Sequence, residues 1–144
     1  MTSTQLYAGD VTTGTAVPVC TMDVTYKTAI LHVAAGWDYM PGHHEPAYAI
    51  AQGTDTIYLN TLFHQSFVDR TLTDWAGPRT FLTRRKISMR DQIYPGDRIE
   101  GHARVLALRT EEAGATLVDL SVIIRTPRAD ACIAECTIRL PERS

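Results

Sequence analysis

The sequence predicts an α+β protein in which an antiparallel sheet wraps around one long helix. Three observations lead to this class. Helical signals gather in the first half of the 144 residues, strand-like segments follow one another in the second half, and one helical segment is apolar enough to need covering. With 44% hydrophobic residues, the chain can bury a core of ordinary size. We therefore expect one domain over residues 1–144.

Before the long helix, the sequence predicts one strand and two shorter helices. Residues 17–25 are rich in valine and threonine, which favour strands. Residues 26–35 carry helical signals that stop at Gly36. Residues 45–52 predict a short helix, because Pro46 suits a first helical turn.

The long helix is predicted from about residue 59 to residue 75, where apolar residues recur at helical spacing. Asn60 is a candidate N-cap, and the breaker pair Gly77 and Pro78 ends the helix. Four consecutive antiparallel strands are expected next: residues 80–89, 98–108, 115–126 and 131–140. The turns between them are expected at residues 94–97, 111–114 and 127–130. The last strand would expose an edge or a face unless a second subunit covered it.

Alternation indicates which side of the last two strands meets the core. In residues 115–126 one face is apolar, formed by Val118, Leu120, Val122 and Ile124. Cys132 and Cys136 fall on the apolar side of the following strand. We interpret both, together with Cys20, as buried thiols, because no paired-ligand spacing or electropositive setting surrounds any of them.

Charge and composition favour no polymeric partner. The formal net charge of -2 gives no reason to expect nucleic acid or a membrane surface. The basic run Arg84, Arg85 and Lys86 alternates along a strand, so at most one face could meet coenzyme A phosphates, and a solvated edge is the preferred interpretation. The first residues lack the basic and apolar regions of a signal peptide, and no apolar run is long enough for a bilayer. We expect a cytoplasmic protein.

The most informative segment places Asp38 five residues ahead of His43, across Pro41 and Gly42. Proline and glycine favour a bent, non-helical stretch on which the two side chains can converge, and a carboxylate beside an imidazole suits proton transfer. A structural hydrogen bond in a loop is the simpler alternative.

The other histidines carry weaker signals. His44 is followed directly by Glu45, but adjacent residues rarely point at one metal and the spacing of a helical zinc motif is absent, so we expect no metal. His32, His64 and His102 are expected at the core edge or the surface, although His64 could line a pocket from the long helix.

Asp38, Pro41, His43 and Ala49 resemble, in register, the motif Gly-Asp-x-Asn-Pro-aliphatic-His with Ala or Ser after five further residues. This is the motif of the MaoC-like hotdog hydratases, the (R)-specific enoyl-CoA hydratases. The turn Tyr94-Pro95-Gly96-Asp97 and the closing Leu140-Pro141 are also similar to that family. The resemblance implies a single hotdog fold, an antiparallel sheet around a central helix. Trp37, Met40 and Gly42 depart from the motif's glycine, asparagine and aliphatic residue.

A narrower resemblance involves the run Ala51-Gln52-Gly53, the residues Ile57 and Asn60, and especially the run Thr73-Asp74-Trp75-Ala76-Gly77-Pro78. These residues are similar to the small MaoC-like subunit of bacterial steroid side-chain hydratases, which works with a second hotdog subunit. The resemblance implies a heterodimer or heterotetramer, with a homodimer possible, and a bulky acyl-CoA substrate from β-oxidation in steroid degradation.

The implied activity is that of a lyase that hydrates a trans-2-enoyl-CoA to the 3-hydroxyacyl-CoA. By resemblance, Asp38 and His43 hold one water, with Asp38 acting mainly as the base and His43 orienting the water and sharing proton delivery. The thioester oxyanion would be met by the backbone amide of Asn60 or of Thr61, with Asn60 preferred. Coenzyme A belongs to the substrate, and no separate cofactor is expected.

Two other functions stay open. A hotdog acyl-CoA thioesterase would also use an acidic residue near the central helix but would release free coenzyme A. A non-catalytic hotdog partner or scaffold subunit is the other alternative, because the departures at Trp37, Met40 and Gly42 could signal lost activity.

Overall fold

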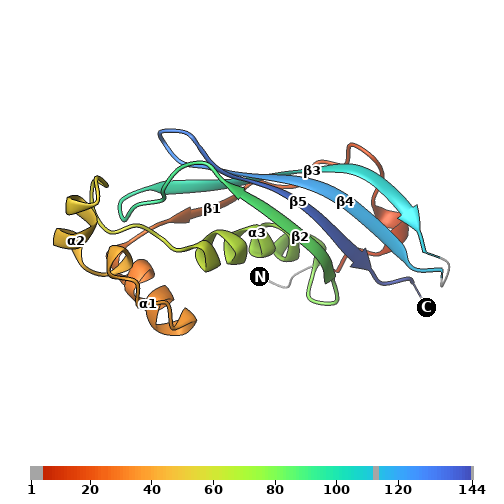
Figure 1. The fold of residues 1–144 in the computed structure, drawn as a ribbon. Coiled ribbons are helices and arrows are strands. Elements are labelled where there is room, and N and C mark those ends of the chain that lie inside the picture. Colours follow the sequence, from red (N-terminus) through yellow and green to blue (C-terminus); the bar gives the residue numbers. More distant parts are fainter. Residues whose placement is uncertain (1–4, 112–113, 144) are drawn as a thin grey trace.

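The computed structural model describes residues 5–111 and 114–143, in which one curved sheet covers a long helix (Figure 1). The predicted α+β class, an antiparallel sheet wrapped around a central helix, is confirmed. The regular elements in chain order are β1 (Cys20–Asp23), α1 (Tyr26–Gly36), α2 (Pro46–Ala51), α3 (Thr61–Ala76), β2 (Phe81–Met89), β3 (Arg98–Thr110), β4 (Thr116–Arg125) and β5 (Asp130–Leu140). Short 3₁₀ turns occupy Ala8–Asp10 and Pro41–His43.

The sheet has five strands in the order β1-β3-β4-β5-β2, and every neighbouring pair is antiparallel. The four expected antiparallel strands are all present, and β2 pairs with β5 rather than with the next strand in the chain, β3. The chain after β2 crosses the end of the sheet, where it is tied to earlier segments by hydrogen bonds from Leu59 N–H to Ile93 C=O (2.9 Å) and from Gly96 N–H to Val24 C=O (2.7 Å). The last strand has no exposed edge, because β5 lies between β4 and β2, but it does have the exposed face that was the other expectation, with Ile133, Glu135 and Arg139 on it.

The first strand is shorter than the predicted residues 17–25. It pairs with β3 only over Cys20–Asp23, with one isolated bridge before it between Ala16 and Arg104. Pro18 lies between the bridge and the strand, and a proline has no N–H to donate to a ladder, so continuous pairing is interrupted there.

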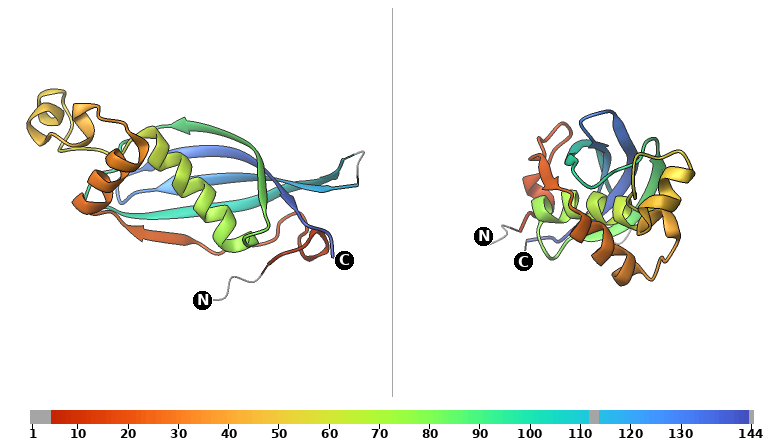
Figure 2. Two further views of the ribbon diagram at one scale, coloured as in Figure 1. Left: turned by 90° about the horizontal axis from the view of Figure 1, so that it is seen from below. Right: turned by 90° about the vertical axis from the view of Figure 1, so that its left-hand side faces the viewer.

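The long helix α3 lies along the concave side of the sheet and forms the core with it (Figure 2). Its buried face carries Phe63, Phe67, Val68, Leu72 and Ala76. The predicted apolar face of β4 is confirmed, since Val118, Leu120, Val122 and Ile124 are all buried. The helices α1 and α2 gather at the end of the sheet where α3 begins. Side chains on the segment between α1 and α2 can therefore meet the start of α3.

The cysteines are free thiols in the described structure. Cys132 and Cys136 are buried as predicted, whereas Cys20 is only half-buried, which corrects the expectation for that residue. Burial raises the pKa of Cys136 to about 12, so this thiol stays protonated and unreactive at neutral pH.

The turn before β3 contains the buried Asp97, which the sequence had marked only as a turn residue. Arg128 binds both carboxylate oxygens, at 2.6 and 2.8 Å, and Tyr94 N–H donates to Oδ2 at 2.8 Å. Burial by itself would raise the pKa of Asp97, but the hydrogen bonds from Arg128 and Tyr94 outweigh it and hold the pKa below its usual range. The pair thus joins the β2–β3 connection to the turn between β4 and β5.

Replacing Arg128 by glutamine is expected to lower the free energy of unfolding by about 2 kcal/mol at pH 7, because a buried carboxylate loses its partner. The folded pKa of Asp97 is lowered, so the stabilisation is present above the unfolded pKa of about 4 and disappears as the pH falls through the folded value. Urea unfolding at pH 7 and pH 3 measures this difference. Arg125→Gln, in the exposed pair Arg125–Asp130, is the control and should cost under about 1 kcal/mol.

Within residues 5–111 and 114–143, no helix is long and apolar enough to cross a membrane. The predicted turn at residues 111–114 includes residues 112 and 113, and the inference about a signal peptide includes residues 1–4; these lie outside the described residues.

Candidate active site

The segment between α1 and α2 positions the predicted pair. Helix α1 ends at Gly36, and the left-handed backbone of its C-cap Trp37 (φ 54°) turns the chain toward Asp38. Pro41–His43 then form one 3₁₀ turn, closed by His43 N–H donating to Met40 C=O at 3.0 Å. The expected bend exists, but it is not the non-helical stretch that was predicted. Pro41 stands at the first position of the 3₁₀ turn, where its fixed backbone torsion fits helical geometry.

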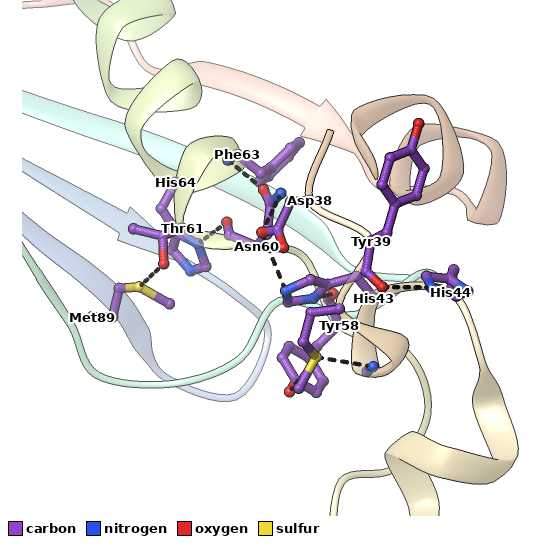
Figure 3. A network of polar contacts seen from close by, with 12 residues as sticks. Asp38, Tyr39, His43, His44, Tyr58, Asn60, Thr61, Phe63, His64 and Met89 are labelled. Atoms are coloured by element: carbon purple, nitrogen blue, oxygen red, sulfur yellow. Dashed lines mark hydrogen bonds and ion pairs between the residues drawn. The ribbon is translucent and has the colours of Figure 1, made fainter. Parts of the chain in front are cut away.

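Asp38 and His43 converge, with 3.6 Å between Asp38 Oδ2 and His43 Nε2 (Figure 3). The His43 side chain is 10% exposed and that of Asp38 36%. His43 Nδ1 lies 2.8 Å from Tyr58 C=O, and a carbonyl can only accept, so Nδ1 carries a proton. In the neutral ring, Nε2 is then an acceptor that faces Asp38. The separation is too long for a direct hydrogen bond and leaves both atoms available to a shared donor.

Asn60 is the N-cap of α3, as predicted, and it also contacts Asp38. Its Oδ1 accepts from Phe63 N–H at 2.9 Å, and its Nδ2 donates to Asp38 Oδ2 at 3.0 Å (Figure 3). The contact with Asp38 was missed by sequence reasoning. Capping preference marks Asn60 from sequence, but no local pattern links it to a residue on another segment.

The predicted oxyanion donors lie beside this pair. The backbone N–H groups of Asn60 and Thr61 have no hydrogen-bond acceptor among the described residues. They lie at the positive end of α3, whose first N–H groups have no partner within the helix. Asn60 is buried and Thr61 exposed, and the Thr61 hydroxyl donates to Met89 Sδ at 3.4 Å. The start of the long helix can therefore bind a partly negative oxygen.

Two of the departures from the motif pack against each other. A Cβ on Gly42 would lie 2.6 Å from Tyr58 Oη and 2.9 Å from Met40 Sδ, so glycine leaves room for both side chains. Met40 Sδ in turn accepts from Gly42 N–H at 3.0 Å. Since Tyr58 supplies the carbonyl that holds His43, Gly42 and Met40 preserve the geometry of the pair.

The third departure, Trp37, stands where the motif has a glycine and adopts a left-handed conformation that glycine adopts without strain. Trp37→Gly is therefore expected to raise the free energy of unfolding by about 1 kcal/mol. Trp37→Ala is the matched control: it removes the same exposed side chain but keeps a Cβ in this conformation. Chemical unfolding followed by circular dichroism measures both, and equal stability of the two variants would contradict the prediction.

The remaining histidines do not join the pair. His44 Nε2 contacts Tyr39 C=O at 3.0 Å, and His102 Nε2 contacts Glu100 Oε2 at 2.8 Å. The prediction for His64 is wrong, because it is fully buried, with Nδ1 donating to Asn60 C=O at 3.0 Å. His32 is half-buried beside a mainly apolar hollow of ≈ 180 Å³ between α1, α3 and β1. Burial lowers the pKa of both His32 and His64, so both rings are neutral at pH 7.

Among the residues that the structure describes, no group of three or more His, Cys, Asp or Glu side chains could hold a metal ion. Arg84 pairs with Glu135 on the outer face, and Arg85 pairs with Asp69 of α3, so neither is a free cation for the coenzyme A phosphates.

Solved structures match this architecture over most of the chain. A chain of the ChsH1-ChsH2 complex from Mycobacterium tuberculosis superposes with a TM-score of 0.84 at 23% identity, covering 90% of this chain and 98% of that one. R-hydratase PhaJ1 from Pseudomonas aeruginosa gives 0.84 at 16% identity, covering 96% and 88%. The (R)-hydratase from A. caviae gives 0.81 at 20% identity, covering 91% and 98%. The chain has the hotdog fold. The predicted resemblance to the MaoC-like hydratases is thus confirmed for the fold.

Sequence comparison finds a curated protein that matches part of this chain. The chain is 40% identical over 45 residues to the 3-oxo-4,17-pregnadiene-20-carboxyl-CoA hydratase beta subunit of Mycobacterium tuberculosis (strain ATCC 25618 / H37Rv). The match covers 31% of this chain and 35% of that protein, so it spans about a third of the curated relative. No family model matches the sequence.

Proposed function

We propose that the chain is a MaoC-like hydratase subunit that adds water to a trans-2-enoyl-CoA and forms the 3-hydroxyacyl-CoA. The observation that carries this proposal is the pair Asp38 and His43, held 3.6 Å apart with both facing atoms able to accept a proton. The start of α3, whose first backbone N–H groups have no partner within the helix, is joined to the pair by the contact between Asn60 and Asp38. A base and an anion-binding group side by side are what addition to an unsaturated thioester requires.

In the proposed reaction, one water donates its two hydrogens to Asp38 Oδ2 and His43 Nε2. Asp38 takes a proton as the water oxygen forms a bond to C3, and the electrons of the C2=C3 double bond move toward the thioester carbonyl. The amide N–H of Asn60 or Thr61 stabilises the negative charge that develops on the carbonyl oxygen. The pair then delivers a proton to C2. One O–H bond of water and the π bond between C2 and C3 are broken, and one C–O and one C–H bond are formed, without a net gain or loss of electrons.

A bulky acyl group and a second hotdog subunit are the finer parts of the proposal. They are supported by the fold match to a chain of the ChsH1-ChsH2 complex and by the partial match to a pregnadiene-carboxyl-CoA hydratase subunit. Large exposed apolar side chains also lie on α1, α2 and the segment between them, next to the candidate site: Tyr26, Ile30, Leu31, Trp37, Tyr39, Met40, Tyr48 and Ile50. A partner that covers this face would make a heterodimer or heterotetramer, or a homodimer if the partner is a second copy.

The test is to express the chain alone and together with a candidate second hotdog subunit, and to supply short-chain and steroid side-chain 2-enoyl-CoA substrates. Loss of the enoyl thioester absorbance, with chromatography of the 3-hydroxyacyl-CoA product, measures hydration. A thiol reagent in parallel detects free coenzyme A. Release of coenzyme A without a hydroxyacyl product would replace the proposal with a thioesterase. Hydration that persists unchanged in the complex when Asp38 is replaced by asparagine would identify a non-catalytic subunit.

A further inference from the structure

We infer that Asn60 is a positioning residue for Asp38, and that its side-chain amide fixes the proposed general base to the start of the central helix. This inference rests on the proposed function. Asn60 lies on α3 and Asp38 on the segment after α1, and the 3.0 Å hydrogen bond from Nδ2 to Oδ2 joins these two elements directly. Asn60 is 3% exposed, so water competes little with this contact.

The orientation of the amide is determined by its other contacts. Oδ1 accepts from Phe63 N–H at 2.9 Å, and only the oxygen of an amide can accept, so Nδ2 must face Asp38. The backbone of Asn60 is held as well, because its carbonyl oxygen accepts a hydrogen bond from His64 Nδ1 at 3.0 Å. The amide therefore cannot turn over without losing the cap of α3. This makes its nitrogen a fixed donor rather than a rotating one.

The chemical consequence concerns the oxygen that faces His43. Asp38 Oδ2 accepts a hydrogen bond from Asn60 Nδ2 at 3.0 Å and lies 3.6 Å from His43 Nε2. A hydrogen bond to a carboxylate favours its ionised form, which is the form that a general base needs. It also limits rotation of the carboxylate, so that the remaining lone pairs point at a shared water. Of the titratable groups around it, His43 lies on the same segment, His64 on α3 contacts the backbone carbonyl of Asn60, and His32 on α1 packs against Phe63.

One further consequence links the base to the oxyanion donor. The backbone N–H of Asn60 is a candidate donor for the thioester oxygen, and its side chain holds Asp38. A substitution that displaces Asn60 would then misplace both the base and the oxyanion donor. Substitution should consequently lower kcat more than it changes KM, because these contacts matter most in the transition state.

Two substitutions separate this role from helix capping. Asn60→Ser keeps an oxygen that can cap Phe63 N–H but is too short to reach Asp38, and Asn60→Asp keeps the shape and the cap but replaces the donor with a second carboxylate. The control is Thr25→Ala, which removes the N-cap of α1, where Thr25 Oγ1 accepts from Thr28 N–H at 3.0 Å. This substitution removes a comparable N-cap, at the end of α1 that lies away from Asp38.

Two measurements are made on the assembled protein: the pH profile of hydration, and the titration of the Asp38 carboxyl carbon by NMR, assigned with Asp38→Asn. We expect Asn60→Ser to lower kcat by about 10- to 100-fold with KM within about 3-fold, and Asn60→Asp to lower kcat further. In both variants the acidic limb of kcat/KM and the NMR midpoint should move to higher pH. Thr25→Ala should leave both unchanged.

An NMR midpoint for Asn60→Ser that equals that of the unsubstituted protein would overturn the inference, and so would a kcat that matches the Thr25→Ala value. Absence of hydration by the unsubstituted complex would instead overturn the proposed function. In that case the NMR titration still decides whether Asn60 controls the carboxylate. The two failures are therefore distinguishable.

Discussion

Asp38→Asn is expected to lower kcat/KM for hydration by about 10³-fold, because an asparagine has the same shape but cannot take a proton from water. The protein should remain folded, since the Asp38 side chain is 36% exposed and no core contact is lost. Steady-state kinetics on a 2-enoyl-CoA measures the first effect and thermal unfolding the second. Glu45→Gln is the matched control: it neutralises an exposed carboxylate on the same segment and should leave the rate within about 2-fold of the original.

His43→Ala is expected to cause a loss of similar size, because the water would lose its second acceptor. If the two groups act on one water, the double variant should be little worse than either single variant, as groups that act as a unit are not additive. Independent losses that multiply would indicate separate roles. Undiminished turnover in both single variants would contradict the assignment of this pair as the catalytic centre.

Gly101→Ala is expected to lower the free energy of unfolding by about 2–3 kcal/mol, because β3 passes close to α3 at this position. A Cβ there would lie 2.2 Å from Thr71 Oγ1 and 3.1 Å from its Cγ2. Thr71 cannot move aside easily, since it is 1% exposed and its hydroxyl donates to Phe67 C=O at 2.8 Å. The helix or the strand must therefore shift away from the core.

A double-mutant cycle in urea isolates this contact. Thr71→Ala removes the two atoms that a Cβ at residue 101 would meet first, so the pair Gly101→Ala with Thr71→Ala should lose less stability than the sum of the single variants. Gly9→Ala serves as the steric control, because a Cβ there meets nothing within 4 Å. Strict additivity between Gly101→Ala and Thr71→Ala would show that the helix and strand do not compete for this space.

Local signals explain how much of the fold could be predicted. Helix α3 begins after Asn60 and ends at Ala76, close to the predicted limits, because a capping side chain and a glycine-proline pair act on their immediate neighbours. The burial of β4 follows from alternation in the same way. The place of β2 could not be predicted, because which strands become neighbours depends on packing over α3 and on a connection that crosses the sheet end.

The candidate site likewise has one part that local sequence predicts and another that depends on the fold. The motif around Asp38 and His43 is contiguous, so local sequence was enough to predict that an acid and an imidazole share one bend. That Tyr58 sets the tautomer of His43 and that Asn60 holds Asp38 became visible in the folded protein alone. Those contacts join segments distant in the chain, and they form only when helix and sheet pack together. Backbone torsions and side-chain periodicity act over a few residues, whereas contacts between elements depend on the whole fold.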